Sequence, residues 1–132
     1  MNLNYKYDFF INHSLFNIND CDVVTYYCPE KKIFEVHSWS FENNQGLIPA
    51  PFADEHRNLT WKFFWESLDD NEKTLAHSYS GPGFFSFMRE TGLDARFGEA
   101  EIRMKKEIIE EWERANNLVI NYDHALVVDF DD

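Results

Sequence analysis

The segment at residues 61–117 constrains the fold of this chain most, because its apolar residues recur at the three- and four-residue spacing of α-helices. Polar and glycine-containing breaks divide the segment into three or four helices. We expect the apolar faces of these helices to form most of the hydrophobic core. The centre of that core is expected to comprise Trp61, Phe64, Trp65, Leu68, Phe84, Phe87, Ile102, Ile108, Ile109 and Trp112.

Residues that cap helix ends set the expected boundaries within this segment. Asn58 or Thr60 can accept hydrogen bonds from the free backbone amides of a first helix. Asp69 or Asp70 can do the same for a second helix. Gly92 suits the left-handed C-terminal cap of a third helix. The fourth and last helix is expected to begin at about Gly98 and to end at about Asn116.

The N-terminal part of the chain has the composition of β-strands. Residues 22–28 are dense in β-branched and aromatic side chains, and residues 33–39 alternate as in a half-buried strand. A turn at residues 29–32 would join the two as a hairpin. Residues 5–11 are a further candidate strand, and residues 47–48 could begin a short one that the following prolines end.

These elements together predict an α+β fold, with a small antiparallel sheet packed against three to four helices. The sheet should combine the N-terminal hairpin with a C-terminal strand at residues 125–130. We expect a single domain over residues 1–132, since a chain of this length buries enough surface to fold without metal or disulfide. Within it, residues 1–52 are β-rich, residues 58–117 are helical, and residues 118–132 form the terminal strand and an acidic tail.

Several motifs, in this order and at these spacings, match a known pattern. Tyr26-Tyr27 precedes the expected hairpin turn, Leu47-Ile48-Pro49 follows it, and residues 63–70 read FFWESLDD. Gly81-Pro82-Gly83 then leads into aromatic residues, and Glu111-Trp112 closes the pattern. Over residues 23–120 the chain resembles the bacterial uncharacterised protein family one-five-eight. The resemblance implies a β-rich start followed by a helical body and implies no activity. The family's basic residues around its glycine-x-glycine have no counterpart at residues 79–88, so it implies no anion site there.

Acidic residues outnumber basic ones by 24 to 12, which gives a net charge of −12 at neutral pH. Fifteen of the acids but only seven of the bases lie in residues 67–132. Such a field repels nucleic acid and anionic lipid and favours basic partners. The acids of the last helix (Glu107, Glu110, Glu111 and Glu113) and of the tail (Asp129, Asp131 and Asp132) could engage a basic groove. A solvated surface that serves only solubility is the alternative reading.

Signatures of catalysis and metal binding are absent from the sequence. The five histidines are scattered and form no cluster with one another or with cysteine. Cys21 and Cys28 are expected to be buried, reduced thiols. The Gly81-Pro82-Gly83 segment lacks the lysine and hydroxyl of a phosphate-binding loop, so a turn between helices is favoured.

We therefore expect a non-catalytic, acidic protein-binding module without a cofactor. Its most concrete form is an inhibitor or immunity protein that neutralises a basic partner such as a toxin, through Glu107, Glu110, Glu111, Asp129 and Asp131. If those charges serve only solubility, the turn at residues 84–87 and the loop at residues 39–52 are the next candidate surfaces.

The alternative function is a small-molecule or nucleotide-binding regulatory domain, or a minor enzyme, with a pocket near the turn from Gly81 to Gly83. Neither a signal peptide nor an apolar run of membrane-spanning length is present, which predicts a cytoplasmic protein without membrane or nucleic-acid partners. The sequence leaves the oligomeric state open.

Overall fold

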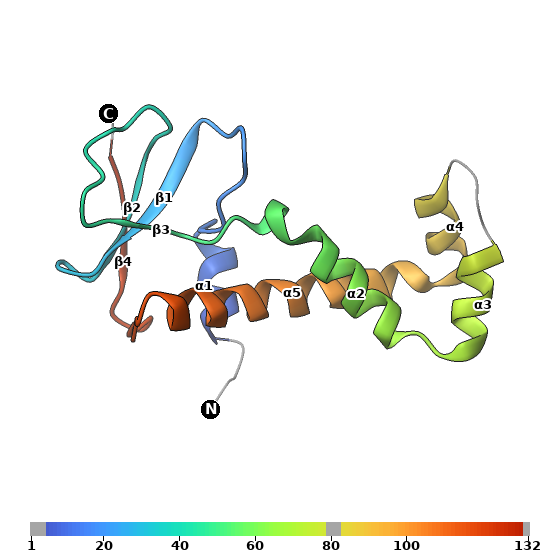
Figure 1. Cartoon of the computed structure of the whole chain (residues 1–132). Helices are drawn as coiled ribbons and strands as arrows, with labels where there is room; N and C mark the ends of the chain where they lie inside the picture. Colours follow the sequence, from blue (N-terminus) through green and yellow to red (C-terminus); the bar gives the residue numbers. More distant parts are fainter. Residues whose placement is uncertain (1–4, 79–82, 131–132) are drawn as a thin grey trace. The chain divides into compact units, whose positions relative to one another are not determined.

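The computed structural model describes residues 5–78 and 83–130 of the chain (Figure 1). Over these residues it has five α-helices, one 3-10 helix and four strands, so the predicted α+β fold is confirmed. In chain order the elements are α1 (Tyr5–Asn12), β1 (Val23–Cys28), β2 (Ile33–Ser38), β3 (Ile48–Pro49), η1 (Ala53–His56), α2 (Arg57–Ser67), α3 (Asp70–Ser78), α4 (Phe84–Thr91), α5 (Leu93–Ala115) and β4 (Leu126–Asp129). None of the helices described is both long and apolar enough to cross a bilayer.

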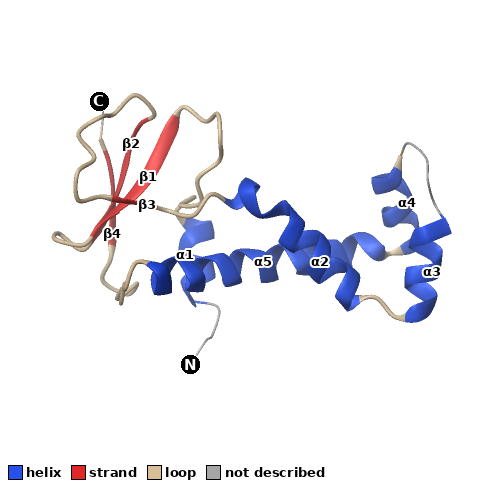
Figure 2. Ribbon diagram, in the orientation of Figure 1, coloured by secondary structure: helices blue, strands red, loops and turns tan. Residues whose placement is uncertain are grey.

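The four strands form one sheet in the order β3-β1-β2-β4 (Figure 2). Strands β1 and β2 make the predicted antiparallel hairpin, with Val23 opposite Ser38 and Cys28 opposite Ile33. Strand β4 runs parallel to β2, so the prediction of a purely antiparallel sheet was wrong. The chain passes through the helices between β2 and β4, and a long helical connection of this kind allows parallel pairing.

The chain divides into two compact units. One, here called the sheet unit, comprises Met1–Glu55 and Lys106–Asp132, and the other, the helical unit, comprises His56–Lys105. Helix α5 contributes residues to both units. The prediction of a single domain is not tested by this division, because two compact units can fold as one cooperative domain.

An aromatic core fills the sheet unit. Trp112 of α5 lies in it, and its indole N–H donates a hydrogen bond to the backbone oxygen of Pro49 at 2.8 Å. The rings of Phe10, Tyr27 and Phe34 pack within 6.3 Å of the Trp112 ring, centroid to centroid. The buried members of this core are Phe10, Leu15, Tyr27, Phe34, Ala50, Ile109, Trp112, Ile120 and Tyr122.

Residues 5–11 were a candidate strand, and this prediction was wrong because they form most of α1. In a helix, residues four apart lie on the same face. That spacing lets Phe10 enter the aromatic core while Lys6, one turn earlier, reaches the carboxylate of Glu113 on α5. The helix is therefore stabilised by residues far along the chain, which a local pattern does not reveal.

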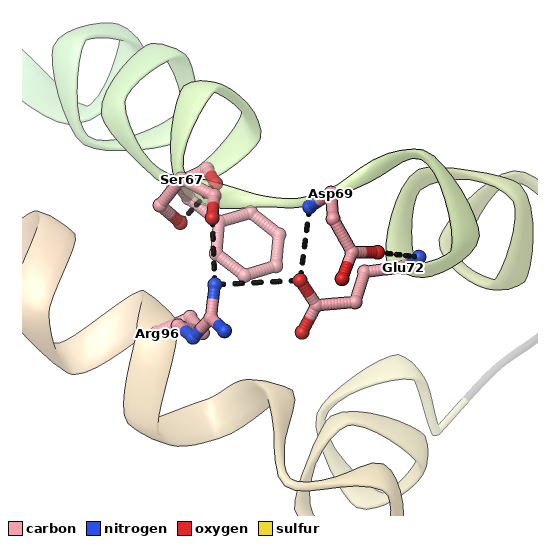
Figure 3. A network of polar contacts seen from close by, with 5 residues as sticks. Ser67, Asp69, Glu72 and Arg96 are labelled. Atoms are coloured by element: carbon pink, nitrogen blue, oxygen red, sulfur yellow. Dashed lines mark hydrogen bonds and ion pairs between the residues drawn. The ribbon is translucent and has the colours of Figure 1, made fainter.

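Reciprocal capping joins α2 to α3 in the helical unit. The backbone N–H of Glu72 donates to the Asp69 carboxylate at 2.8 Å, and the N–H of Asp69 donates to the Glu72 carboxylate at 2.9 Å. This capping box makes Asp69, and not the alternative Asp70, the cap of the second helix. Arg96 of α5 donates to the backbone oxygen of Ser67, at the end of α2, and pairs with Glu72 at 3.3 Å (Figure 3).

The other expected helix ends were only partly right. The N-cap residue of α2 is His56 and it makes no side-chain cap, so neither Asn58 nor Thr60 has the predicted role. Thr60 is instead buried in the packed face of α2. Gly92 is the left-handed C-cap of α4, as predicted, with a φ of 79°. Helix α5 follows at once and tolerates Gly98 within it, whereas the sequence suggested a start near that glycine.

Five of the ten predicted core residues are buried: Phe64, Leu68, Ile108, Ile109 and Trp112. Trp65 and Phe87 are partly buried, and the side chain of Phe84 is outside the described part. Trp61 and Ile102 were wrongly placed in the centre, because their side chains are 40% and 38% exposed. The buried residues Leu93, Ala100 and Met104 were missed, Leu93 because the last helix was expected to begin only at about Gly98.

Candidate functional site

Three of the predicted partner-binding acids share one face of α5. Glu107, Glu110 and Glu111 are all exposed, and their spacing of three and four residues makes them neighbours on the helix surface. Glu111 pairs with Arg114 at 2.5 Å, but both side chains are about two-thirds exposed, and such a pair contributes little to stability. We call these three residues the acidic face of α5.

The acids of the C-terminal tail belong to a different element. Asp129 is exposed at the end of β4, opposite Val36 in the parallel pairing. Asp131 and Asp132 lie outside the described residues. The structure thus groups the three helix glutamates on one surface, and it places Asp129 on the edge strand of the sheet rather than on α5.

Glu113 does not belong to the acidic face, although it was expected there. Its side chain is buried, and its two carboxylate oxygens accept hydrogen bonds from the Lys6 ammonium at 2.7 Å and the Tyr122 hydroxyl at 2.9 Å. The network links α1, α5 and the segment before β4. A buried carboxylate with two donors is stabilised internally, so its charge is not available to a partner.

The network also changes the titration of its members. The hydrogen bond to Glu113 raises the pKa of Lys6, against the opposing effect of its partial burial. Burial raises the pKa of the Tyr122 hydroxyl far above its ordinary value, and the Glu113 charge and hydrogen bond raise it further. At neutral pH Lys6 is therefore a cation, and Tyr122 is a neutral donor to the carboxylate.

A second buried acid lies on the other face of the sheet. Glu35 accepts a hydrogen bond from, or pairs with, the His37 ring nitrogen at 2.8 Å, and the residues are 6% and 3% exposed. The His37 ring stacks on Phe41 at 3.7 Å and on Phe130 at 4.5 Å, centroid to centroid. Strand β2 was predicted to be half-buried, but it carries buried residues on both sides, Phe34 on one and Glu35 and His37 on the other. The two aromatic rings cover His37 on that second side.

The Glu35–His37 pair has the residue types of an acid–base dyad but not the access. Both faces of the imidazole are covered by rings, so a substrate could not approach it without displacing Phe41 or Phe130. The pair therefore acts as a polar contact within the fold. Elsewhere in residues 5–78 and 83–130, histidine, cysteine and acidic side chains form no group of three suited to a metal ion.

A hollow on the surface of the sheet unit lies beside β1. This groove has a volume of about 460 Å³, within the range of ligand sites, and all of its lining residues belong to the sheet unit. They are Ile18, Asn19, Asp20, Cys21, Asp22, Val24, Trp39 and Phe52. We call it the Trp39 groove. Its walls include an exposed indole, an exposed thiol and two carboxylates.

Asn17 positions the wall of the Trp39 groove. Its buried carboxamide accepts from the Thr25 N–H at 2.7 Å and donates to the Thr25 and Ala50 oxygens at 2.9 Å. Its backbone N–H donates a hydrogen bond to the Pro51 oxygen, and its backbone oxygen accepts one from the Ala53 N–H. The Asn17 side chain therefore makes hydrogen bonds to β1 of the kind that a neighbouring strand would make. These bonds fix the start of the loop that follows Asn17 and lines the groove.

Sequence reasoning found only part of this groove. The loop at residues 39–52 was a secondary candidate surface, and its two ends, Trp39 and Phe52, do line the hollow. The segment at residues 18–24 was missed. The signal there was Asn19-Asp20, since both residue types tolerate left-handed backbone, and Asp20 has a φ of 62°.

Two other expectations concern residues near these features. Cys21 lines the groove and is exposed, so only Cys28 has the predicted buried position, and both thiols are free. At the alternative pocket, Gly81 and Pro82 lie outside the described residues. Gly83 is the left-handed residue preceding α4, with a φ of 85°.

Comparison with known proteins gave no match, whether to family models, to curated proteins or to solved structures. The resemblance to the bacterial family one-five-eight therefore stays a prediction. Any function must be argued from the surfaces of the chain itself.

Proposed function

We propose that the protein is a non-catalytic, acidic protein-binding module of the cytoplasm. Its most concrete form is an inhibitor or immunity protein that neutralises a basic partner such as a toxin. The observation that carries the proposal is the acidic face of α5, which presents Glu107, Glu110 and Glu111 from a rigid helix in a chain of net charge −12.

The physical basis is electrostatic attraction at long range. A strongly negative surface raises the rate at which a positively charged protein encounters it, and it disfavours nucleic acids and other acidic proteins. Charges at the rim of an interface act mainly on this association rate, whereas apolar and aromatic anchors determine the lifetime of the complex. Exposed aromatic side chains such as Trp39 are available for that second role.

The test compares two variants with the same change of charge. One carries Gln or Asn at the proposed contacts, Glu107, Glu110, Glu111, Asp129 and Asp131. The matched control carries Gln or Asn at five other acids, the exposed residues Glu30, Glu42, Glu90, Glu99 and Asp123. Proteins retained by the immobilised wild-type chain from its host lysate are identified, and the association rate of each purified candidate is measured at low and high salt.

A basic protein should bind the wild type and the control at similar rates, and salt should slow both. The contact variant should bind it more slowly, with a weaker dependence on salt. Equal slowing in both variants would assign the effect to net charge alone. An unchanged association rate in the contact variant would reject the acidic face of α5 as the contact surface.

A further inference from the structure

The Trp39 groove combines the two chemistries that an arginine side chain requires. We infer that it binds an arginine of the basic partner, with the guanidinium group at Asp20 and Asp22 and the aliphatic stem against Trp39. This inference rests on the proposed function, because it names one contact that the basic partner makes. It goes beyond the acidic face of α5, because that face accounts for long-range attraction and this inference names an individual contact.

Exposed apolar side chains gather at this groove. Trp39 is 69% exposed and Ile18 is 57% exposed, and Val23, beside the lining residues Asp22 and Val24, is 47% exposed. Single exposed apolar residues are common on soluble proteins, but a group of them around one hollow is typical of an interaction site. Tryptophan is also among the residues most enriched at the energetic centre of interfaces.

The negative charge of the groove determines the sign of the charge that its ligand should carry. Among the described residues that line it, Asp20 and Asp22 are charged, and lysine and arginine do not occur. Asp54 lies close by, since its carboxylate accepts hydrogen bonds from the backbone and side chain of Asn19. A cation is therefore favoured, whereas a phosphate, a nucleic acid or an anionic membrane surface is repelled.

Arginine fits this surface better than lysine. Its guanidinium group is planar, stacks on aromatic rings and forms paired hydrogen bonds with carboxylates. Trp39 offers the ring, and the two aspartates offer the acceptors. The ammonium of lysine is more strongly hydrated and lacks the flat face, so it gains less from the indole.

The groove is held in shape before any ligand arrives. Asn17 fixes the start of the loop through its buried carboxamide. Asp20 has a left-handed backbone conformation, and the backbone N–H of Trp39 donates to the backbone oxygen of Asp22 at 2.9 Å. A preformed site loses little conformational entropy on binding, which favours recognition of a small group such as one side chain.

The experiment uses the full chain labelled with 5-fluorotryptophan and observed by fluorine NMR. Its four tryptophans give separate signals, and the Trp39 signal is assigned with Trp39→Phe. The probe is N-acetyl-arginine methylamide, and its neutral counterpart is the citrulline derivative of the same shape. Both are titrated into the wild type, into the double variant Asp20→Asn/Asp22→Asn, and into the control Glu90→Gln/Glu99→Gln, which removes two exposed charges from the helical unit.

The arginine probe should shift the Trp39 signal saturably and bind at least about tenfold more tightly than the citrulline probe, because its hydrogen bonds to carboxylates are charge-assisted. The aspartate variant should lose this preference, and the control should keep it. Equal binding of the two probes, or no saturable shift of Trp39, would overturn the inference. A shift confined to another tryptophan would also overturn it.

Failure of this inference can be told apart from failure of the proposed function. If the probe does not bind but the α5 contact variant still slows a basic partner, the groove assignment falls and the proposed function stands. In another outcome, the probe binds at Trp39 while neither the α5 contact variant nor Asp20→Asn/Asp22→Asn changes the association rate of the basic partner. The groove would then bind arginine without taking part in the complex with that partner. Such a result would contradict the inference as stated and the proposed function together.

Discussion

The longest-range hydrogen bonds of the sheet unit join residues much further apart in the chain than those of the helical unit. In the sheet unit, Lys6 bonds to Glu113 across 107 positions of the chain, and Trp112 bonds to Pro49 across 63. In the helical unit, the capping box joins Asp69 and Glu72, which are three residues apart. The sheet unit therefore needs both ends of the chain at once, whereas the start of α3 in the helical unit is determined locally.

The two units also differ in where their polar groups lie. The carboxylates of Glu35 and Glu113 are buried and hydrogen-bonded in the sheet unit. The Arg96–Glu72 pair of the helical unit is partly exposed. Buried networks lose much stability when one member is removed, and exposed pairs lose little. The comparison thus predicts large effects of substitution in the sheet unit and small ones in the helical unit.

The largest effect is expected from Trp112→Ala. The side chain is 8% exposed within the aromatic core, so its removal should lower the free energy of unfolding by about 3–5 kcal/mol. The matched control is Trp39→Ala, where the indole is 69% exposed and the loss should stay below about 1 kcal/mol. Urea unfolding followed by circular dichroism measures both. Similar losses in the two variants would show that the aromatic core does not dominate the stability of the sheet unit.

The second-largest loss of stability is expected from Asn17→Ala, which removes the hydrogen bonds to Thr25 and Ala50. Buried backbone groups would lose partners, so the loss of stability should be about 2–4 kcal/mol. Asn58→Ala serves as the control, since Asn58 is exposed in the first turn of α2 and should cost less than about 0.5 kcal/mol. Equal losses would mean that water replaces the carboxamide at β1.

The same contrast explains how much of the fold could be predicted from the sequence. The hairpin, the Asp69 cap and the Gly92 cap depend on residues close together in the chain, and each was predicted correctly. The helical state of residues 5–11 and the parallel pairing of β4 depend on distant partners, and both were missed. Propensity is a weak guide where tertiary contacts decide the conformation.

The candidate surfaces follow this division as well. Helical periodicity alone placed Glu107, Glu110 and Glu111 on one exposed face, because they lie on a single element. The same periodicity places Glu113 four residues after Ile109, on the buried face, and this signal was missed. Its partner Lys6, at the other end of the chain, could not be inferred from the helix. The Trp39 groove draws its lining from three separate segments, so no single stretch of sequence contains it.

Alkaline pH should weaken the sheet unit through its raised pKa values. Tyrosine ionises near pH 10 in the unfolded chain, while burial raises the pKa of Tyr122 and of Tyr27 in the folded state. The unfolded chain then binds fewer protons, so this stability is fully present below about pH 10 and is lost as the pH rises toward the folded-state values. Lys6 acts in the same direction, because its pKa is also raised.

The measurement is the melting temperature between pH 8 and pH 11. It should fall above about pH 10 in the wild type and fall less steeply in Tyr122→Phe, which has no hydroxyl to ionise. A parallel fall in the two proteins would show that Tyr122 does not contribute to the alkaline loss.

The smallest effect is expected from Asp69→Ala in the helical unit. The substitution removes the acceptor for the Glu72 N–H and should cost about 1 kcal/mol, as is usual for the loss of an N-terminal cap. Asp70→Ala is the control, because its side chain is exposed in the first turn and should contribute only a few tenths of a kcal/mol through the helix dipole. Amide hydrogen exchange should show faster exchange within α3 and unchanged protection in β1 and β2, since a local cap governs local opening. An equal loss of protection in the strands would mean that the two units unfold together. The contrast between local and long-range stabilisation would then describe the contacts of the folded protein but not its unfolding.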